Sequence, residues 1–248
     1  MSFISKSKVF AYLLALISVI GFVLFVIFRQ TGQFNLEVIL PYRKMLFSSF
    51  FNTIIVSMIT LFSSLIVGFI FYLLSISKIK YFNAIVEIFT EIVYGTPLLV
   101  LVVVTAFLIG PAFGSYNRNF LGILSLILYM APYMKNVFKS AIASIDEEQY
   151  LVIEVFGFTK YQKYRYIIFP QILRVLMPPL MNNLSLVIKG SALLNVLSYN
   201  ELFYTTAVIQ SRTYAFVEGY IVMWMLYLII TIPLSNLAKF IERKWATI

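Results

Sequence analysis

Two long runs of this sequence carry no charged residue. They are Val9–Phe28 and Phe51–Leu74, and both are rich in Leu, Ile, Val and Phe. About 20 consecutive apolar residues suffice for a helix to cross the hydrocarbon core of a bilayer. Each run therefore predicts a membrane-spanning helix. The first is too long for the hydrophobic region of a signal peptide, so we expect it to be retained.

Four further apolar stretches extend this pattern: Ile85–Ile109, Leu121–Met134, Ile172–Val196 and Val217–Leu237. Gly95-Thr96-Pro97 interrupts the first of them, and for Pro97 alone we favour an ordinary proline kink. Charged residues make up 12% of the chain and hydrophobic residues 61%, whereas about a quarter of a soluble domain is charged. We predict an all-α integral membrane protein with about six transmembrane helices.

Neither Cys nor His occurs in the sequence. Disulfide scaffolds, thiolate or imidazole metal sites and histidine bases are therefore excluded. No glycine-rich loop is followed by the Lys-Ser/Thr pair of a Walker motif, so the chain is not expected to hydrolyse ATP itself. We predict no catalytic residue and no metal site.

The basic residues beside the spans predict the orientation of the chain. With the amino terminus in the cytoplasm, the cytoplasmic loops receive the larger set: Lys6, Lys8, Lys78, Lys80, Lys135, Lys139, Lys160, Lys163, Arg165, Arg174, Lys239, Arg243 and Lys244. The opposite side receives Arg29, Arg43, Lys44, Arg118 and Arg212, and Lys189 lies within a span. Both termini are thus expected in the cytoplasm. The net charge of +9 then reflects topology and not nucleic-acid binding.

The longest polar stretch on the predicted cytoplasmic side is Lys139–Arg165. A helix is expected to begin near Ser144, because the acidic residues that follow favour the first turn of a helix. Its apolar part, Tyr150–Phe156, stops at Gly157, a residue typical of helix C-termini. This helix is too short to cross the membrane. From the pattern alone it lies along the interface, packs under the bundle or docks into a groove on another protein.

The fifth span carries unusual polar residues. Asn182, Ser185 and Lys189 fall at i, i+3 and i+7 and share one helical face, which we expect to point inward. A polar pathway and hydrogen bonding between helices explain this face equally well, and Lys189 can also reach the outer interface. The residues predicted for a translocation pathway are Thr96, Asn182, Ser185, Lys189, Ser191 and Glu201.

All ten acidic residues lie in loops or near span ends, with Glu218 the nearest to an exception. Ion-coupled carriers usually bury acids at mid-membrane, so any transport by this chain is expected to draw its energy from elsewhere. The alternative is a stand-alone ion-coupled secondary amino acid transporter, in which Glu201 or Glu218 would be essential. A membrane enzyme or a scaffold is a third possibility, and the missing His and Cys disfavour an enzyme.

A series of motifs follows in a fixed order: Gly95-Thr96-Pro97-Leu98-Leu99, Ala141-Ile142-x-Ser144-Ile145-Asp146, Gly157-Phe158-Thr159-x-x-Gln162-x-x-Arg165, Pro170-Gln171, Arg174-x-x-x-Pro178-Pro179-x-x-Asn182, Lys189-Gly190-Ser191 and Asn200-Glu201-Leu202. Because of these motifs, the segment from about Phe50 to Trp245 resembles the permease subunits of bacterial ABC importers for polar amino acids, the histidine and glutamine permease family. The resemblance is specific because many motifs occur at the right separations, and no single one would suffice.

The resemblance implies the transmembrane domain of a type I ABC importer, with a five-helix core and one added amino-terminal helix. It divides the chain into an anchor helix with an outer loop at 1–45 and a permease domain at 46–245. The cytoplasmic loop at about 140–165 would form the coupling helix, which docks on a separate ATPase subunit. The residues implied in this contact are Asp146, Gln149, Leu151, Glu154, Phe156, Gly157, Gln162 and Arg165.

The resemblance also implies the partners. ATP-binding cassette ATPase subunits would bind ATP and Mg²⁺, while this chain binds no cofactor of its own. A second permease subunit, identical or related, would complete the passage. An extracellular or periplasmic substrate-binding protein would deliver a polar amino acid for import. The expected place is the bacterial cytoplasmic (inner) membrane, in contact with lipid and not with nucleic acid.

Three positions depart from the family's pattern. Leu151-Val152-Ile153 stands where the family has a Glu-Ala-Ala hallmark, so an apolar docking contact would replace a charged one. Tyr94 stands where an arginine is usual, and Gly190 stands where many members carry aspartate. An unusual amino acid as substrate and the less active half of a heterodimer are both compatible with these changes.

Overall fold

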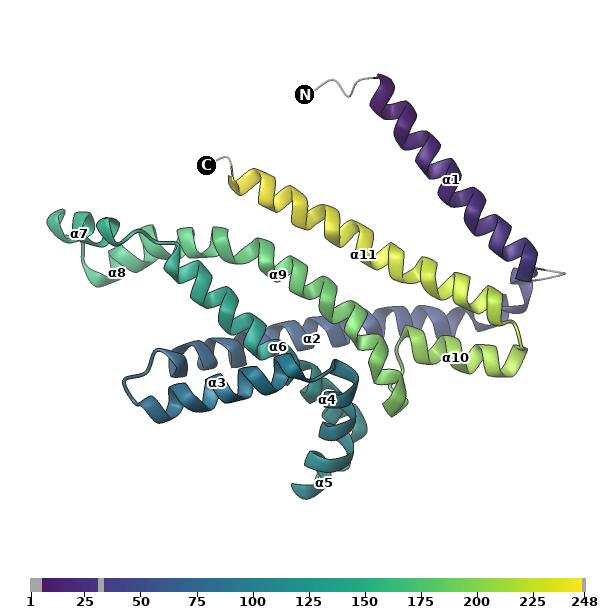
Figure 1. The fold of residues 1–248 in the computed structure, drawn as a ribbon, viewed down its shortest axis with the longest axis horizontal. Helices are drawn as coiled ribbons and strands as arrows, with labels where there is room; N and C mark the ends of the chain where they lie inside the picture. The colour runs from purple at the N-terminus through teal and green to yellow at the C-terminus, as the bar shows by residue number, and fades with distance from the viewer. Residues whose placement is uncertain (1–5, 31–33, 247–248) are drawn as a thin grey trace.

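The computed structural model describes residues 6–30 and 34–246, and the side chains of residues 8–30 and 34–243. Every regular element within these ranges is helical (Figure 1). The predicted all-α class is therefore confirmed. The side chains of Lys6 and Lys244, which entered the predicted orientation, lie outside the described residues.

Five helical stretches are long and apolar enough to cross a membrane, and a bent pair of helices raises the number to six. The five contain α1 (Lys6–Gln30), α2 (Arg43–Ser75), α6 (Arg118–Ala143), α9 (Phe169–Ser191) and α11 (Phe216–Ala246). Most of these helices extend beyond the predicted apolar runs. Helical hydrogen bonding continues through polar flanking residues, whereas a hydropathy pattern ends at the first of them.

The third predicted span is broken. α3 (Lys80–Gly95) meets the stretch that begins with α4 (Leu98–Val104) at 114°, and this stretch continues through the π-helical η3 (Thr105–Ile109) into α5 (Gly110–Ala112). Thr96 is extended, as a residue before proline usually is, and Pro97 has no N–H with which to continue the helix. The expected ordinary kink is wrong, because the chain leaves the helix altogether at this point.

α2 is the central helix and packs against both α6 and α9. Its buried face is lined by small hydroxyl side chains, namely Ser49, Thr53, Ser57, Thr60 and Ser64. Most of these hydroxyls donate to a carbonyl of the preceding turn, as Ser57 Oγ does to Thr53 O at 2.7 Å. Small side chains let helices approach closely in a membrane. At Gly68 the approach is so close that a Cβ atom would clash with Met134 of α6.

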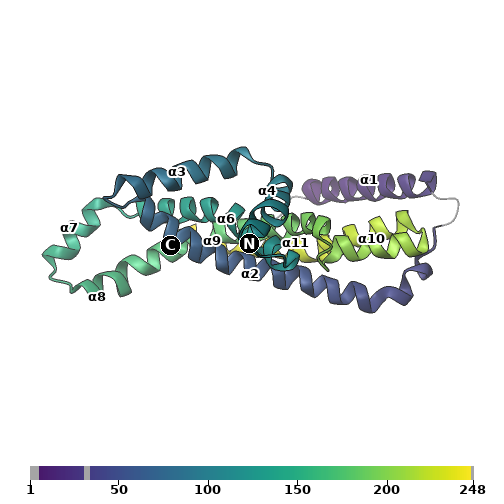
Figure 2. The ribbon, with the colours of Figure 1, turned by 90° about the horizontal axis from the view of Figure 1, so that it is seen from below.

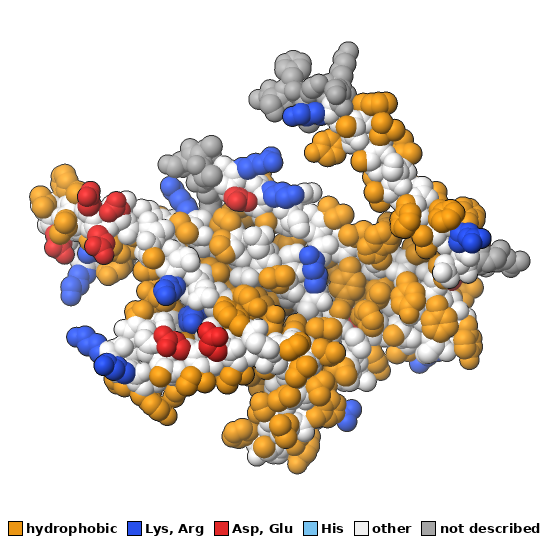
Figure 3. All heavy atoms as spheres, in the orientation of Figure 1, with side chains coloured by type: hydrophobic (Ala, Val, Ile, Leu, Met, Phe, Trp, Pro, Cys, Tyr) orange, Lys and Arg blue, Asp and Glu red, His pale blue; other side chains and the backbone are white. Residues whose placement is uncertain are grey.

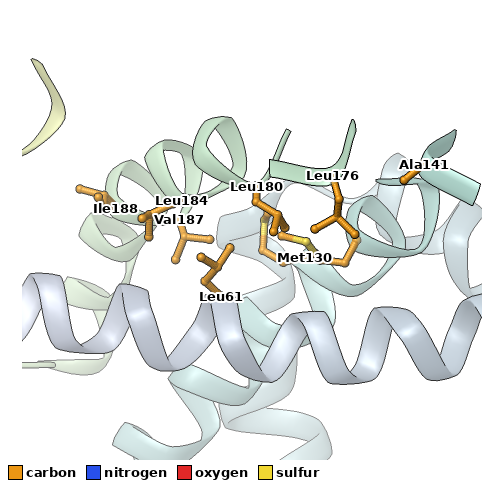
Figure 4. Packing of buried hydrophobic residues seen from close by; sticks show 9 residues of the cluster. Leu61, Met130, Ala141, Leu176, Leu180, Leu184, Val187 and Ile188 are labelled. Atoms are coloured by element: carbon orange, nitrogen blue, oxygen red, sulfur yellow. The ribbon is translucent and has the colours of Figure 1, made fainter. Parts of the chain in front are cut away.

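The main hydrophobic core lies where α2, α6 and α9 meet (Figure 4). Leu61 of α2, Met130 of α6 and Leu184 and Val187 of α9 belong to this one buried cluster. α9 therefore packs against both neighbours at several positions along its length.

α1 stands apart from this bundle (Figures 1 and 2). Its described side chains are almost all exposed, and its carboxyl end meets the first turns of α11 across an apolar groove of about 740 Å³. Lipid suits such a helix, because its backbone groups are paired internally and its side chains are apolar. α1 is thus a span beside the packed bundle and not a part of it.

The two ends of the bundle differ (Figure 2). At one end α7 (Glu147–Val155) and α8 (Lys160–Gln162) connect α6 to α9 by way of the π-helical η4 (Lys163–Ile168). At the other end lie α10 (Leu202–Thr213) and the 3₁₀ turns η1 (Leu36–Val38) and η2 (Leu40–Tyr42), which precede α2. The 3₁₀ helix η5 (Ala192–Leu197) leads from α9 towards α10, a helix that the sequence pattern did not predict.

Candidate functional site

α7 is a short helix with well-defined ends. Asp146 is its N-cap, and the Asp146 side chain accepts a hydrogen bond from Glu148 N at 2.9 Å. The predicted start near Ser144 is therefore two residues early, and Ser144 instead ends α6 as its C-cap. Gly157 follows the C-cap residue Phe156 with φ of +68°, a conformation that side chains with a Cβ rarely adopt. The chain can turn back sharply at this point because residue 157 is glycine.

Buried contacts fix α7 to the bundle. Ile153 of α7 is 4% exposed and packs with Ile145 and Ile168, which lie before and after the α7–α8 hairpin. Gln171 Nε2, in the first turn of α9, donates to Gln149 Oε1 of α7 at 3.1 Å. Of the predicted coupling residues, Gln149 thus faces the bundle. These contacts join α7 to the base of α9.

α7 and its C-cap residue also carry large apolar side chains that are exposed. We call these four side chains the α7 surface: Leu151, Val152, Val155 and Phe156. Val155 and Phe156 are 86% and 75% exposed. Acidic side chains gather at the α7 end of the molecule (Figure 3). The sequence pattern had singled out Leu151, Glu154 and Phe156. It missed Val155, because one apolar residue within an apolar run carries no separate signal.

The segment after α7 is held by its own side chains. Thr159 and Gln162 form a capping box, in which Gln162 N donates to Thr159 Oγ1 at 3.3 Å and Thr159 N donates to Gln162 Oε1 at 2.9 Å. Lys163 Nζ lies 4.6 Å from the centre of the Tyr150 ring, and burial raises the pKa of the Tyr150 phenol, which keeps it neutral. Arg165 is exposed. Gln162 therefore shapes the loop, while Arg165 remains accessible to a partner.

A second group of side chains gathers where α3 and α6 meet. The Tyr94 ring of α3 lies 5.0 Å from that of Tyr133 on α6, and Tyr133 lies 5.4 Å from Tyr129. Asn136 Nδ2 donates to the Tyr94 hydroxyl at 2.7 Å. Tyr94, one of the positions that depart from the family's pattern, therefore joins α3 to α6.

One lysine in this region is buried. Lys135 of α6 is 8% exposed, and its Nζ donates to Thr90 Oγ1 of α3 at 3.0 Å. The exposed acids Glu87 and Glu91 lie on the same helix as Thr90 and act electrostatically on Lys135. Sequence reasoning had placed Lys135 in a cytoplasmic loop, because it follows the last residue of an apolar run. The structure places it within α6.

The polar residues of α9 divide between two faces. Asn182 and Lys189 are exposed and Ser185 is half-buried, so the other helices of this chain do not cover this face, and its orientation away from lipid stays a prediction. Instead Asn183 is buried against Met134, and Ser191 Oγ donates to Ile188 O at 2.8 Å. Helical periodicity identified the shared face correctly. Which way that face points is decided by packing against α2 and α6.

Exposed polar residues of three helices occur within the candidate spans. We call them the polar face: Glu91 and Tyr94 of α3, Asn136 of α6, and Asn182 and Lys189 of α9. Charged and amide groups at membrane depth are costly in lipid and are usually covered by protein or by a water-filled passage. Thr96 lies beside this face, with its Oγ1 donating to Ile92 O at 2.6 Å at the end of α3.

The two acids named for an ion-coupled mechanism both have structural partners. Glu201 is fully buried and is the N-cap of α10, where its carboxylate accepts from Phe203 N at 2.8 Å, Tyr204 N at 2.7 Å and the Tyr227 hydroxyl at 2.8 Å. Glu218 is 7% exposed and accepts from Asn35 N at 3.0 Å. Both carboxylates connect segments at the α10 end of the bundle.

Comparison with known proteins gives a consistent result. A family described as "Binding-protein-dependent transport system inner membrane component" matches residues 64–247. The probable glutamine ABC transporter permease protein GlnM of Bacillus subtilis (strain 168) is 26% identical over 210 residues, which cover 85% of this chain and 97% of that protein. The putative glutamine transport system permease protein GlnP of Rickettsia prowazekii (strain Madrid E) is 27% identical, with coverage of 76% and 87%.

Solved structures agree with the fold. One described as an amino acid ABC transporter with histidines superposes with a TM-score of 0.76 at 24% identity and covers 87% of this chain and 100% of its own. An inward-facing methionine ABC transporter, MetNI, gives a TM-score of 0.64 at 18% identity, with coverage of 83% and 98%. The predicted fold, that of a type I ABC importer transmembrane domain, is confirmed.

Proposed function

We propose a function from the family to which this chain belongs, the binding-protein-dependent transport system inner membrane components. The chain carries a polar amino acid into the cell as the permease subunit of an ATP-binding cassette importer. The observation that carries the proposal is the α7 surface. Four large apolar side chains are exposed outside the candidate spans, on a helix that is joined to the base of α9 by a hydrogen bond and buried packing. Such a surface needs a partner that covers it.

The partner would be an ATPase subunit. ATP and Mg²⁺ bind on that subunit, and its closure moves α7. Because Gln149 bonds to Gln171 and Ile153 packs on Ile168, a displacement of α7 moves the base of α9 with it. α9 is packed along α2 and α6, so the displacement reaches the polar face. Asp146, Glu154 and Arg165 would place charges around the apolar contact.

The polar face would line the passage for the solute. Thr96, Asn182, Ser185 and Lys189 lie on or beside it, while Ser191 and Glu201 are buried and support the same helices from within. A second permease subunit, identical or related, would cover the face and complete the passage. A separate binding protein would deliver the amino acid on the outer side. Residues 1–45 would then form an anchor and outer loop before a permease domain at 46–245.

This assignment places the α7 end, and both termini, in the cytoplasm of a bacterial cell. The chain contains no Cys, so single cysteines report topology without background. In intact cells or spheroplasts that lack the ATPase subunit, Tyr214→Cys should react with a membrane-impermeant maleimide, whereas Val155→Cys should react only after permeabilisation. Both side chains are at least 80% exposed, so access to the side chain does not limit the reaction. The reverse pattern would contradict the orientation.

The transport proposal is tested in proteoliposomes. Proteoliposomes that contain this chain, its second permease subunit and the ATPase should take up amino acid only under two conditions. ATP must be present on the side of the membrane that the ATPase faces, and a loaded binding protein must be present on the other side. Liposomes that contain this chain alone should take up none, with or without a proton or sodium gradient. Uptake driven by an ion gradient without the ATPase would overturn the proposal.

A further inference from the structure

A small cavity opens beside the polar face, directly after the break in the third span. Its volume is about 260 Å³, and side chains of α4, α6 and α9 surround it. Leu98 is contributed by α4, Tyr129 and Tyr133 by α6, and Leu186 and Gly190 by α9. Leu186 is 52% exposed and lies one helical turn from Asn182 and Lys189, so the cavity opens on the polar face.

The lining of this cavity is uncharged throughout. Besides the aliphatic side chains, its polar groups are the hydroxyls of Tyr129 and Tyr133, and Tyr133 Oη donates to Tyr129 Oη at 3.3 Å. A charged group that enters such a site loses its hydration and gains no opposite charge. An uncharged side chain avoids that cost, and the Tyr129 hydroxyl still has a proton to offer to an amide or hydroxyl oxygen.

Gly190 leaves the space that makes the cavity. A Cβ atom at this position would lie 3.0 Å from Leu98 Cδ2, so a larger residue would fill the space between α9 and α4. The neighbouring Lys189 is exposed on the face where the cavity opens. Lys189 can therefore hold a carboxylate at the rim, while an attached side chain enters the cavity.

From this juxtaposition we infer that the cavity is the side-chain subsite of the passage, and that it selects an α-amino acid whose side chain is uncharged. The inference rests on the proposed transport function and adds the substrate class. Lys189 would pair with the α-carboxylate, and the cavity would exclude the side chains of arginine, lysine, aspartate and glutamate.

Binding to the membrane complex tests this inference, because in a transport assay the separate binding protein would also select solutes. The complex of permease and ATPase subunits in nanodiscs is titrated with radiolabelled L-glutamine, L-leucine, L-arginine and L-glutamate in equilibrium dialysis. We expect the better of the two uncharged amino acids to bind at least tenfold more tightly than either charged one. Tighter binding of arginine or glutamate, or no saturable binding of any probe, would overturn the inference.

Variants locate the subsite. Gly190→Val should weaken binding of the preferred probe at least tenfold, whereas Gly21→Val, on α1 with nothing within 4 Å of its Cβ, should leave binding unchanged. If Gly190→Val does not assemble, Leu186→Trp narrows the same cavity from its exposed rim. Gly190→Asp should raise the affinity for arginine relative to glutamine at least tenfold. Wild-type binding in these variants would place the subsite elsewhere.

The role of Lys189 needs a separate variant. Lys189→Gln should weaken binding of every probe that has an α-carboxylate, and Lys189→Arg should restore most of the affinity. The amide L-glutaminamide, which lacks the carboxylate, should bind the wild type and Lys189→Gln equally weakly. Normal binding of glutamine by Lys189→Gln would overturn the assignment of Lys189 as the partner of the α-carboxylate. Failure of ATP-driven uptake of any amino acid would instead overturn the transport function itself.

Discussion

The α7 surface and the polar face are exposed in opposite ways. On α7, large apolar side chains such as Val155 and Phe156 stand outside the candidate spans, where water would surround them. On α3 and α9, charged and amide side chains such as Glu91 and Lys189 stand inside the candidate spans, where lipid would surround them. Each surface would be unfavourable if the chain were alone.

The comparison explains how one chain can serve two partners. Exposed apolar groups outside the membrane favour a protein that offers an apolar groove. Exposed polar groups at membrane depth favour a second membrane subunit and an aqueous passage. α9 begins beside the first surface and carries part of the second, so it joins the two.

The largest expected effect is at the α7 surface. Phe156→Asp places a charge in the apolar contact and should reduce copurification of the ATPase subunit at least a hundredfold, while membrane insertion stays normal. The matched control is Phe113→Asp, because Phe113 is 86% exposed in the turn after α5, on another part of the molecule. Normal copurification with full ATP-dependent uptake in Phe156→Asp would show that α7 is not the docking element.

The second largest effect is a loss of stability at the close contact between α2 and α6. Gly68→Val forces a side chain into Met134 at the α2–α6 contact and should destabilise the fold by about 3 kcal/mol, towards the upper end of overpacking costs. Thermal unfolding of the purified complex measures this loss. Gly95→Val is the control for the change of residue, because nothing lies within 4 Å of a Cβ at Gly95. Equal melting temperatures for both variants would contradict the close contact.

A smaller loss of stability is expected when Glu201 is replaced. This variant compares a buried acid with an exposed one. Glu201→Ala leaves two N–H groups of α10 and the Tyr227 hydroxyl without their acceptor, and should cost about 2 kcal/mol of stability. Glu242→Ala, on an exposed acid of α11, should cost almost nothing. If a proton gradient drove uptake by the wild type, and Glu201→Ala lost that uptake but kept its stability, an ion-coupling role would replace the structural one.

The smallest effect is expected within the polar face. Tyr94→Phe removes the acceptor of the Asn136 amide and should cost about 1 kcal/mol, because the ring contact with Tyr133 remains. ATPase copurification should not change, and the amino acid affinity of the complex should change no more than about fivefold. A loss of ATPase association in this variant would mean that the two surfaces are not separable.

Sequence patterns predicted the membrane class and the spans, because both follow from local composition. The patterns also predicted α7, with a start two residues early, since its acids, its apolar run and Gly157 are local signals. The patterns missed α10, whose twelve residues mix polar and apolar side chains and whose N-cap Glu201 is held by Tyr227 from α11. They also missed the hydroxyl-lined face of α2, because the four small hydroxyl residues within the apolar run Phe51–Leu74 leave the run apolar on average.

The break at Pro97 and the orientation of α9 show the limit of local reasoning. Proline permits a kink and a break alike, and the neighbouring helices decide between them. Asn182 and Lys189 share a face by helical periodicity, whichever direction that face takes.

By itself, the order of residues determined which segments enter the membrane and which short helix remains outside, since hydropathy and helix capping act over a few turns. Only the packing of the helices against one another decided which polar side chains are buried with hydrogen-bond partners and which line a cavity. Burial depends on neighbours that are distant in the sequence, as Gly190 and Leu98 are.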